Sequence, residues 1–449
     1  MKRKIYDTMK QWKAEGGKSA LLIDGARRVG KSYISEEFGR REYKSYILID
    51  FNRAGSDIRE LFDRHLNDLD TFFLYLSSLF NVRLHDRESL IIFDEVQMFP
   101  RARAAIKYLV ADGRYDYIET GSLMSIRKNV QDIVIPSEER HVKMFPMDFE
   151  EFLWALGQDQ LMPIIARCFE KQAAPDESFH RKAMDFFRQY MIVGGMPQAV
   201  AAFADEKDFS AVDRIKRDIL ALYRADIAKH AAGCEAKVRS LFDDIPAQLQ
   251  KHEKKFQLAS LKKEARFREY EDALFWLDDA MITNNCYRCT EPSIGLKLNM
   301  ERLALKCYMA DTGLLISHAF DENAIVSEEL YRKLLFDKLE INKGMLVENI
   351  VAQMLAASGH KLYFYSNSSR DDAASRMEVD FLIAKRSITS RHNISPIEVK
   401  SGKGYALSSI RKFIARYAAM LHTAYVIHSQ NFRVEKGIVY LPLYMTPCL

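Results

Sequence analysis

The segment GARRVGKS at residues 25–32 constrains this chain more than any other feature of its sequence. It matches the pattern G-x-x-x-x-G-K-[ST] at every fixed position, directly after the apolar run 20–24 and directly before a helical pattern. A glycine-rich turn between a buried strand and a helix directs backbone N–H groups and the positive end of the helix dipole toward an anion. The segment therefore predicts a loop that binds the phosphates of a nucleotide.

Positions of this predicted phosphate loop have expected roles. Lys31 would reach the β- and γ-phosphates, and the Ser32 hydroxyl would ligate magnesium. For Arg27 and Arg28, a solvated loop charge is the alternative to a contact with the nucleotide or with a partner. A turn that binds nothing is disfavoured because all four fixed positions are present. The residues expected to line the nucleotide here are Gly25, Ala26, Arg27, Arg28, Val29, Gly30, Lys31, Ser32 and Tyr33.

A second apolar run ends in two carboxylates. The segment LIIFDE places Asp94 and Glu95 at the carboxyl end of a predicted buried strand, the edge at which a parallel sheet binds its ligand. Asp94 would hold the magnesium, usually through water. Glu95 would orient and deprotonate the water that attacks the γ-phosphate. A cap of the following turn is the alternative for this acidic pair.

Two further positions belong to less specific patterns. The strand predicted at 115–119 is followed by Thr120 and Ser122, where a hydroxyl could sense the γ-phosphate or position water. An ordinary turn hydroxyl is an equal alternative. Arg140 is a candidate arginine finger, and a surface ion pair with the two preceding glutamates is the alternative.

The spacing of apolar runs predicts an α/β fold class. An amphipathic helix at 1–14 comes first, and short apolar runs separated by crossover-length segments then favour a doubly wound parallel sheet. After about residue 147 the pattern becomes mostly helical. The strands expected in the first part are 20–24, 46–51, 90–93 and 115–119, and the helices expected after it lie around 149–154, 186–191 and 215–223.

The rest of the chain returns to a mixed pattern. Between about 238 and 300, short helices followed by runs at 282–284 and 296–300 could form a helical triad with a β-hairpin wing. The strands expected in the final third are 362–365, 378–384, 396–399, 424–427 and 438–443.

Two of these later strands carry a second set of candidate residues. Asp380 lies in one, and Glu398 and Lys400 lie in or directly after the next. Neighbouring twisted strands can bring such side chains to one point, where two carboxylates bind magnesium and a lysine assists phosphodiester hydrolysis. Glu348, in a helical segment, is a further candidate ligand. Glu-x-Lys occurs four times in the chain, but only Glu398 sits in an apolar strand that follows an Asp-bearing one; an isolated copy would form a surface ion pair.

Composition excludes several classes of protein. A length of 449 residues corresponds to roughly three domains, and 48% hydrophobic with 29% charged residues excludes disorder or a fibrous architecture. Six irregularly spaced cysteines do not form a disulfide framework, and we expect Cys286 and Cys289 to pack rather than to bind zinc. Without an apolar run of about 18 residues, we expect no membrane span. The sparse cysteines and the basic amino end with no apolar region after it predict a reduced, cytoplasmic protein.

Charge is unevenly distributed although the whole chain carries only +4. Residues 341–449 hold 14 Lys and Arg against 7 Asp and Glu, a net charge of +7, which is expected of a module that meets a polyanion. The segment 251–270 is also rich in Lys and Arg. It indicates a nucleic-acid face, with a solvated helix surface as the alternative.

Together these motifs resemble a family of prokaryotic ATP-binding proteins, in which an AAA-type P-loop ATPase precedes a domain of unknown function with a PD-(D/E)XK nuclease-like core. The likeness covers nearly the whole chain. GARRVGKS is similar to the family's Walker A segment, LIIFDEVQ to Walker B, ETGS to its sensor segment and ERHVKMFPMDFEEF to the strand and helix that carry its arginine, although Arg140 lacks the usual preceding glycine. The later similar blocks are GGMPQAV, EYEDALFWLDDAMI, KCYMADTGLL, LVENIVAQML, EVDFLI and PIEVKSGK.

The resemblance implies three parts. These are an AAA-type P-loop ATPase domain at 1–147, a helical region at 148–335 with a winged helix at about 238–300, and a restriction-endonuclease-like α/β domain at 336–449. Matched position by position, Lys31, Ser32, Asp94 and Glu95 take nucleotide and magnesium roles. Asp380, Glu398 and Lys400 match the nuclease core.

Three functional hypotheses follow. The first is a Mg-dependent ATPase that moves a winged-helix and nuclease-like module on nucleic acid, with ATP and Mg as cofactors. The second is an ATP-gated DNA or RNA endonuclease. The third is a nucleotide-switched binding or scaffold protein with a vestigial nuclease fold. No membrane partner is expected, and a homo-oligomer is left open.

Overall fold

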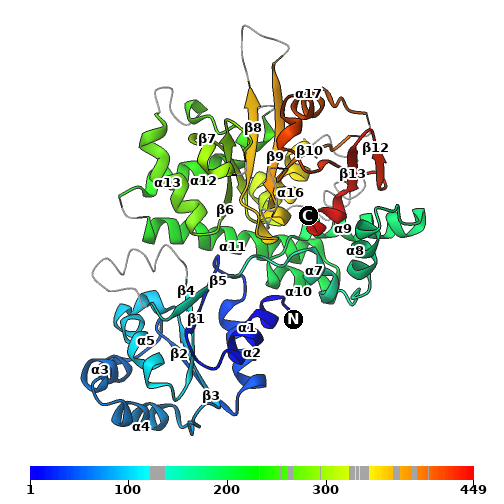
Figure 1. Cartoon of the computed structure of the whole chain (residues 1–449). Coiled ribbons are helices and arrows are strands. Elements are labelled where there is room, and N and C mark those ends of the chain that lie inside the picture. The colour runs from blue at the N-terminus through cyan, green and yellow to red at the C-terminus, as the bar shows by residue number, and fades with distance from the viewer. Residues whose placement is uncertain are drawn as a thin grey trace. The chain divides into compact units, whose positions relative to one another are not determined.

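The computed structural model contains two compact units, Met1–Phe145 and Pro146–Leu449, each with its own sheet (Figure 1). It describes residues 1–121, 137–231, 233–251, 255–260, 266–293, 295–322, 329, 333, 343–367, 375–385, 392–402 and 404–449. Within these residues, no helix combines the length and the apolar character that crossing a bilayer requires.

The first unit is a parallel sheet between two layers of helices, as the apolar runs predict, with a fifth strand, β5, in addition to the four expected from those runs. Its strand order is β2-β3-β4-β1-β5, so the strand that precedes the phosphate loop and the strand that ends in the acids both adjoin β4. The elements are α1 (Ile5–Ala14), β1 (Ala20–Asp24), α2 (Lys31–Glu42), β2 (Ser45–Asp50), α3 (Ser56–His65), α4 (Leu69–Phe80), β3 (Ser89–Asp94), η1 (Val96–Met98), α5 (Pro100–Asp112), β4 (Asp116–Gly121) and β5 (Glu139–Lys143).

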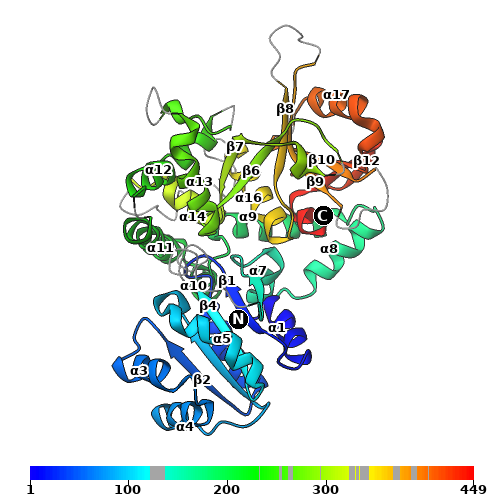
Figure 2. The ribbon, with the colours of Figure 1, turned by 60° about the vertical axis from the view of Figure 1, so that its left-hand side comes forward.

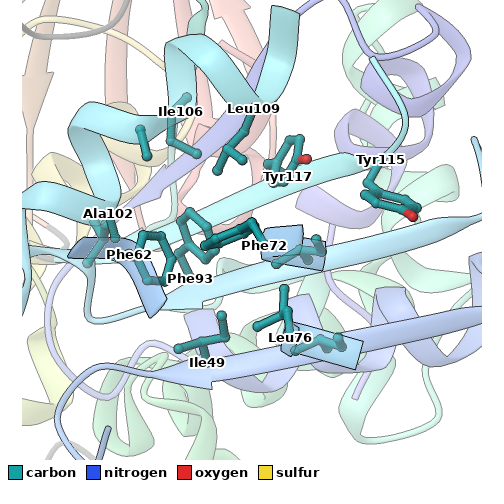
Figure 3. Packing of buried hydrophobic residues seen from close by; sticks show 14 of the residues in the cluster. Ile49, Phe62, Phe72, Leu76, Phe93, Ala102, Ile106, Leu109, Tyr115 and Tyr117 are labelled. Carbon is teal, nitrogen blue, oxygen red and sulfur yellow. The ribbon is translucent and has the colours of Figure 1, made fainter. Parts of the chain in front are cut away.

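The core of this unit lies between the sheet and the helices α3, α4 and α5 (Figure 3). Phe62 of α3 is fully buried, and its ring centroid lies 5.1 Å from that of Phe72 and 5.7 Å from that of Phe93. Edge-to-face pairs of this kind stabilise beyond the apolar area that they bury. This packing fixes β3, and with it the position of the acids at the carboxyl end of β3.

The second unit combines a helical part with an eight-stranded mixed sheet. Figure 2 shows the helices and the sheet from a second direction. The order of its strands is β12-β13-β11-β10-β9-β8-β6-β7. The helical elements are α7 (Phe149–Ala155), α8 (Leu161–Glu170), α9 (Glu177–Val193), α10 (Pro197–Glu206), α11 (Phe209–His230), α12 (Glu235–Gln250), η2 (Leu258–Ser260), α13 (Phe267–Asp279), η3 (Leu296–Asn299), α14 (Thr312–Ala319), α16 (Lys343–Ala357), α17 (Ser408–Tyr417), η4 (Ala418–Met420) and η5 (Leu443–Cys448). The strands are β6 (Thr283–Cys289), β7 (Met300–Met309), β8 (Tyr363–Asn367), β9 (Met377–Ala384), β10 (Ile394–Val399), β11 (Ala424–His428), β12 (Arg433–Glu435) and β13 (Ile438–Pro442).

Two expectations differ from this architecture. The run 296–300 was expected as a strand, but Leu296–Asn299 is a 3-10 turn, and the strand begins only at Met300. The turn is closed by the N–H of Leu298, which donates to the carbonyl of Gly295. The strands β6 and β7 do form an antiparallel hairpin, but β6 also pairs in parallel with β8. One sheet therefore contains strands from both sides of the boundary expected at 335/336.

Candidate functional site

The phosphate loop connects β1 to α2 along a path that needs glycine at two positions. Gly30 has a φ of 96°, in the left-handed region where side chains are unfavourable. A Cβ on Gly25 would lie 2.5 Å from the carbonyl oxygen of Met144. The buried Arg3 also holds this loop, because its guanidinium donates to the carbonyl of Val29 at 2.8 Å. Nothing in the sequence pattern pointed to Arg3.

Lys31 is buried at the start of α2. Its Nζ donates to the carbonyl oxygens of Gly25 at 2.8 Å and Ala26 at 3.0 Å, so the ammonium lies within the loop. Burial lowers the pKa of Lys31, whereas the nearby carboxylates, chiefly Glu95, oppose that shift. A cation so placed matches the charge of nucleotide phosphates.

Ser32, Asp94 and Thr120 meet at the carboxyl ends of the strands. The Ser32 hydroxyl donates to Asp94 Oδ1 at 2.7 Å, and the Thr120 hydroxyl donates to the same oxygen. Asp94 is 7% exposed. These three residues come together because β4, which ends near Thr120, lies between β1 and β3 in the sheet. A hydroxyl and a carboxylate in contact beside the phosphate loop fit Mg²⁺, which prefers oxygen ligands.

Glu95 adopts a left-handed conformation with a φ of 54° directly after β3. Its backbone N–H donates to Thr120 Oγ1 at 3.4 Å, and Gln97 Nε2 donates to its carboxylate. These contacts turn the chain at the strand end. Thr120, which the sequence offered only as one of two hydroxyls, thus contacts both acidic residues.

The other residues expected near the nucleotide differ in exposure. Ala26 and Val29 are buried, whereas the side chains of Arg27, Arg28 and Tyr33 are exposed. Ser122 lies outside the described residues.

The arginine considered as a finger forms a different ion pair from the one that the sequence predicted. Arg140 Nη1 lies 2.6 Å from Glu15 Oε1, a residue at the end of α1, rather than beside either preceding glutamate. Glu139 instead accepts two hydrogen bonds from Arg103, at 3.0 and 2.8 Å. The structure therefore gives Arg140 a different ion-pair partner from the expected one.

A charged network that the sequence did not reveal lies directly before the phosphate loop. His141 Nδ1 is 3.4 Å from Asp24 Oδ2, and His141 Nε2 is 3.2 Å from Glu139 Oε2. These two contacts raise the pKa of His141 to about 9. The imidazolium therefore links β5 to the last residue of β1.

In the second unit, the predicted carboxylates and lysine line one cavity of about 360 Å³. Asp380 Oδ2 accepts the backbone N–H of Val399 at 2.8 Å, and Lys400 Nζ donates to Glu398 Oε1 at 2.7 Å. Burial raises the pKa of Glu398 to about 8. The pairing of β9 with β10 brings Asp380, Glu398 and Lys400 together, and Glu348 of α16 lines the same cavity. These four residues are here called the carboxylate centre (Glu348, Asp380, Glu398 and Lys400).

Lys306 of β7 also belongs to this centre, although the sequence did not predict it. Its Nζ lies 2.9 Å from Glu378 Oε1, 3.3 Å from Glu348 Oε1 and 3.8 Å from Asp380 Oδ1. Burial opposes its charge, but the surrounding carboxylates hold the pKa of Lys306 well above its ordinary value. Within the described parts of the chain, no three His, Cys, Asp or Glu side chains are arranged to hold a metal ion. The ammonium of Lys306 therefore lies among the acids that the sequence predicted as metal ligands.

The two cysteines of the Cys-x-x-Cys segment are free and buried. Cys289 Sγ lies 3.1 Å from the carbonyl oxygen of Glu291, and burial raises the pKa of this thiol to about 11. Such thiols pack in the sheet and are not reactive.

Family models match three separate parts of the chain. Residues 17–153 match the model of an AAA domain, and the first unit is accordingly an AAA-type P-loop domain. Residues 184–323 and 343–445 match two domains of unknown function, DUF8612 and DUF4143. No curated protein sequence matches the chain significantly.

Several solved structures resemble the chain weakly. The Drosophila ORC bound to DNA has a TM-score of 0.29 and 13% identity, over 70% of this chain and 94% of that one. AMPPCP-bound DnaA from Aquifex aeolicus has a TM-score of 0.26 and 14% identity, over 60% and 82%. The STAND protein PH0952 from Pyrococcus horikoshii has a TM-score of 0.29 and 11% identity, over 80% and 49%. Likeness at this level carries no property of those proteins to this chain.

Proposed function

We propose that this protein is a magnesium-dependent AAA-type ATPase that couples ATP binding and hydrolysis to its second unit, which acts on nucleic acid. The observation that carries the proposal is the contact between Ser32 and Asp94 beside the buried Lys31. These three residues supply the oxygen ligands and the cation that ATP and Mg²⁺ need.

Roles for the residues of this site follow from their positions. Lys31 would bind the β- and γ-phosphates, and Ser32 and Asp94 would hold Mg²⁺, which neutralises charge on the phosphate oxygens. Glu95, turned at the end of β3, would orient the attacking water and accept its proton. Thr120 would keep Asp94 oriented through its hydrogen bond.

Phosphate release by purified full-length protein tests the ATPase. We expect Mg-dependent release by the wild type, weakened ATP binding in Lys31→Ala, and retained ATP binding with slow turnover in Glu95→Gln. Lys107→Ala, on the exposed side of α5, is the matched control and should behave like the wild type. Equal rates in all four proteins, or none in any of them, would refute the proposal.

The assignment of the second unit is also a proposal. Two helices, α12 and α13, precede the β6–β7 hairpin, which supports a winged-helix arrangement at about 238–300. Asp380 and Glu398 on the paired strands β9 and β10, beside α16, support a nuclease-like fold at 336–449. The excess of positive charge in residues 341–449 supports nucleic acid as the polyanion.

Binding of labelled single- and double-stranded DNA and RNA, followed by fluorescence anisotropy, tests the partner. If the proposal holds, affinity falls steeply with salt and differs between ATP-bound Glu95→Gln and the ADP-bound wild type. If the bound nucleotide changed the affinity for none of these nucleic acids, the proposed coupling between ATP and the second unit would be contradicted.

An ATP-gated endonuclease is the second candidate, favoured by the gathering of Asp380, Glu398 and Lys400 around one cavity. Its test is incubation of supercoiled DNA and of RNA with Mg²⁺ or Mn²⁺ and ATP. Cleavage that Asp380→Ala abolishes would support this candidate. Equal nicking by the wild type and the variant would exclude this centre as its source.

A further inference from the structure

The carboxylate centre already contains a positive charge in the place where its acids converge. Lys306 Nζ contacts Glu378 and Glu348, and Asp380 Oδ1 is 3.8 Å away. Tyr308, two residues along the same strand, donates from its hydroxyl to Glu348 Oε1. The strand β7 therefore supplies both a cation and a hydrogen-bond donor to acids that lie on α16 and β9.

This ammonium cannot readily leave. Lys306 is 1% exposed, and its backbone is paired with Cys286 in the interior of the β6–β7 hairpin. The centroid of the Phe364 ring, on β8, lies 5.0 Å from Lys306 Nζ. Moving the ammonium elsewhere in the interior would leave a buried charge without a partner, which is very costly.

A divalent cation would compete for the same oxygens. Mg²⁺ requires ligands at about 2.1 Å in octahedral geometry, and an ammonium placed among these oxygens both occupies the position of the ion and repels it. Glu398 is only 7% exposed, and its Oε1 accepts from Lys400. Its Oε2 has no hydrogen-bond partner among the described residues and could serve as a further ligand once the Lys306 ammonium is gone.

We propose that Lys306 is the resident cation of the carboxylate centre, that it closes the centre to divalent metal ions in the wild-type chain, and that its removal opens a site for one Mg²⁺- or Mn²⁺-class ion at Glu348, Asp380 and Glu398. This inference goes beyond the ATPase and does not depend on it. It also implies that the wild-type protein cleaves no phosphodiester at this centre by a metal-dependent route.

Mn²⁺ titration of nucleotide-free full-length protein, followed by the electron paramagnetic resonance signal of free Mn²⁺, tests the proposal. We expect Lys306→Met to gain one site per chain that is at least roughly tenfold tighter than any Mn²⁺ binding at this centre in the wild type. The double variant Lys306→Met/Asp380→Asn should lose the gained site. Lys385→Met, an exposed lysine after β9, is the control and should bind like the wild type.

The wild type provides a test that does not depend on the folding of the Lys306 variant. Asp380→Asn in the otherwise unchanged chain should leave Mn²⁺ binding as it is, because the centre is closed. Loss of a Mn²⁺ site in Asp380→Asn would overturn the proposal. So would a Lys306→Met protein with wild-type circular dichroism and no gained site. Because no nucleotide or turnover is involved, these outcomes are independent of whether the protein hydrolyses ATP.

Discussion

Ser32 Oγ donates a 2.7 Å hydrogen bond to Asp94 Oδ1, and this contact joins the first turn of α2 to the last residue of β3. The two residues are 62 positions apart in sequence. Their contact depends on both strands meeting at β4, because β1 and β3 do not adjoin each other.

Asp94→Asn tests the charge at this contact. The amide keeps the size of the side chain and can still accept from Ser32, but it removes the negative charge that Mg²⁺ needs. We expect Mg-dependent phosphate release to fall by about 100-fold, with little change in Mg-free nucleotide binding. Asp57→Asn, at an exposed position of α3, is the control. A wild-type rate for Asp94→Asn would contradict the assignment.

Thr120→Val tests the hydroxyl between the two acids. The substitution keeps the branched shape but removes the donor to Asp94 and the acceptor for the Glu95 N–H. We expect a loss of about 1–3 kcal/mol in the free energy of unfolding of the first unit, with slower turnover and nearly unchanged nucleotide affinity. Thr120→Ser retains the hydroxyl and should preserve most of both properties. Damage in Thr120→Ser but not in Thr120→Val would show that the methyl group, not the hydroxyl, matters.

His141 should make stability depend on pH. Its pKa of about 9 in the folded chain exceeds the ordinary value of 6.5, because Asp24 and Glu139 hold the imidazolium. A raised pKa stabilises the folded state fully below about pH 6.5, and the contribution declines as the pH rises through 9. His141→Gln should therefore lower the midpoint of thermal unfolding at pH 6 and have little effect at pH 10. An equal loss at both pH values would indicate packing instead.

Gly195→Ala should destabilise the second unit. A Cβ there would lie 2.1 Å from the carbonyl oxygen of Met147, and backbone cannot move aside as a side chain can. We expect a cost of about 1–3 kcal/mol, typical of overpacking, measured by chemical denaturation. Gly404→Ala is the matched control, because nothing lies within 4 Å of its Cβ position and its φ is not positive. Equal stability of the two variants would show that the close approach of Gly195 to the Met147 carbonyl does not require glycine.

Four strands of the first unit were predictable from short apolar runs, because strands in the interior of a sheet are mostly apolar, and the run 90–93 shows this directly. No apolar run indicated β5, because its sequence ERHVK is charged and partly exposed. The phosphate loop and the acids could be assigned for a similar reason, since their roles fix residue types at fixed spacing. Arg140 shows where such reasoning stops. Its partner Glu15 is 125 residues away, and no local pattern indicates which of many surface acids it meets.

Lys306 marks a second limit. One lysine in the buried half of β7 was a detectable signal, because a charge among apolar residues needs a partner, but the sequence does not say which partner. The partners of Lys306 depend on the parallel pairing of β6 with β8, because this pairing brings β7 into the same sheet as β9. The 3-10 turn at Leu296–Asn299 was missed because short apolar runs do not distinguish a turn from a strand.

The shared sheet has a consequence for any study of the carboxyl-terminal segment by itself. A fragment cut to the DUF4143 match at 343–445 would keep α16, β8, β9 and β10 but would lose β6 and β7. It would expose a bare edge at β8, which invites association with other chains. It would also retain the acids without Lys306. Metal binding or nicking by such a fragment would then be a product of the excision and not a property of the intact protein.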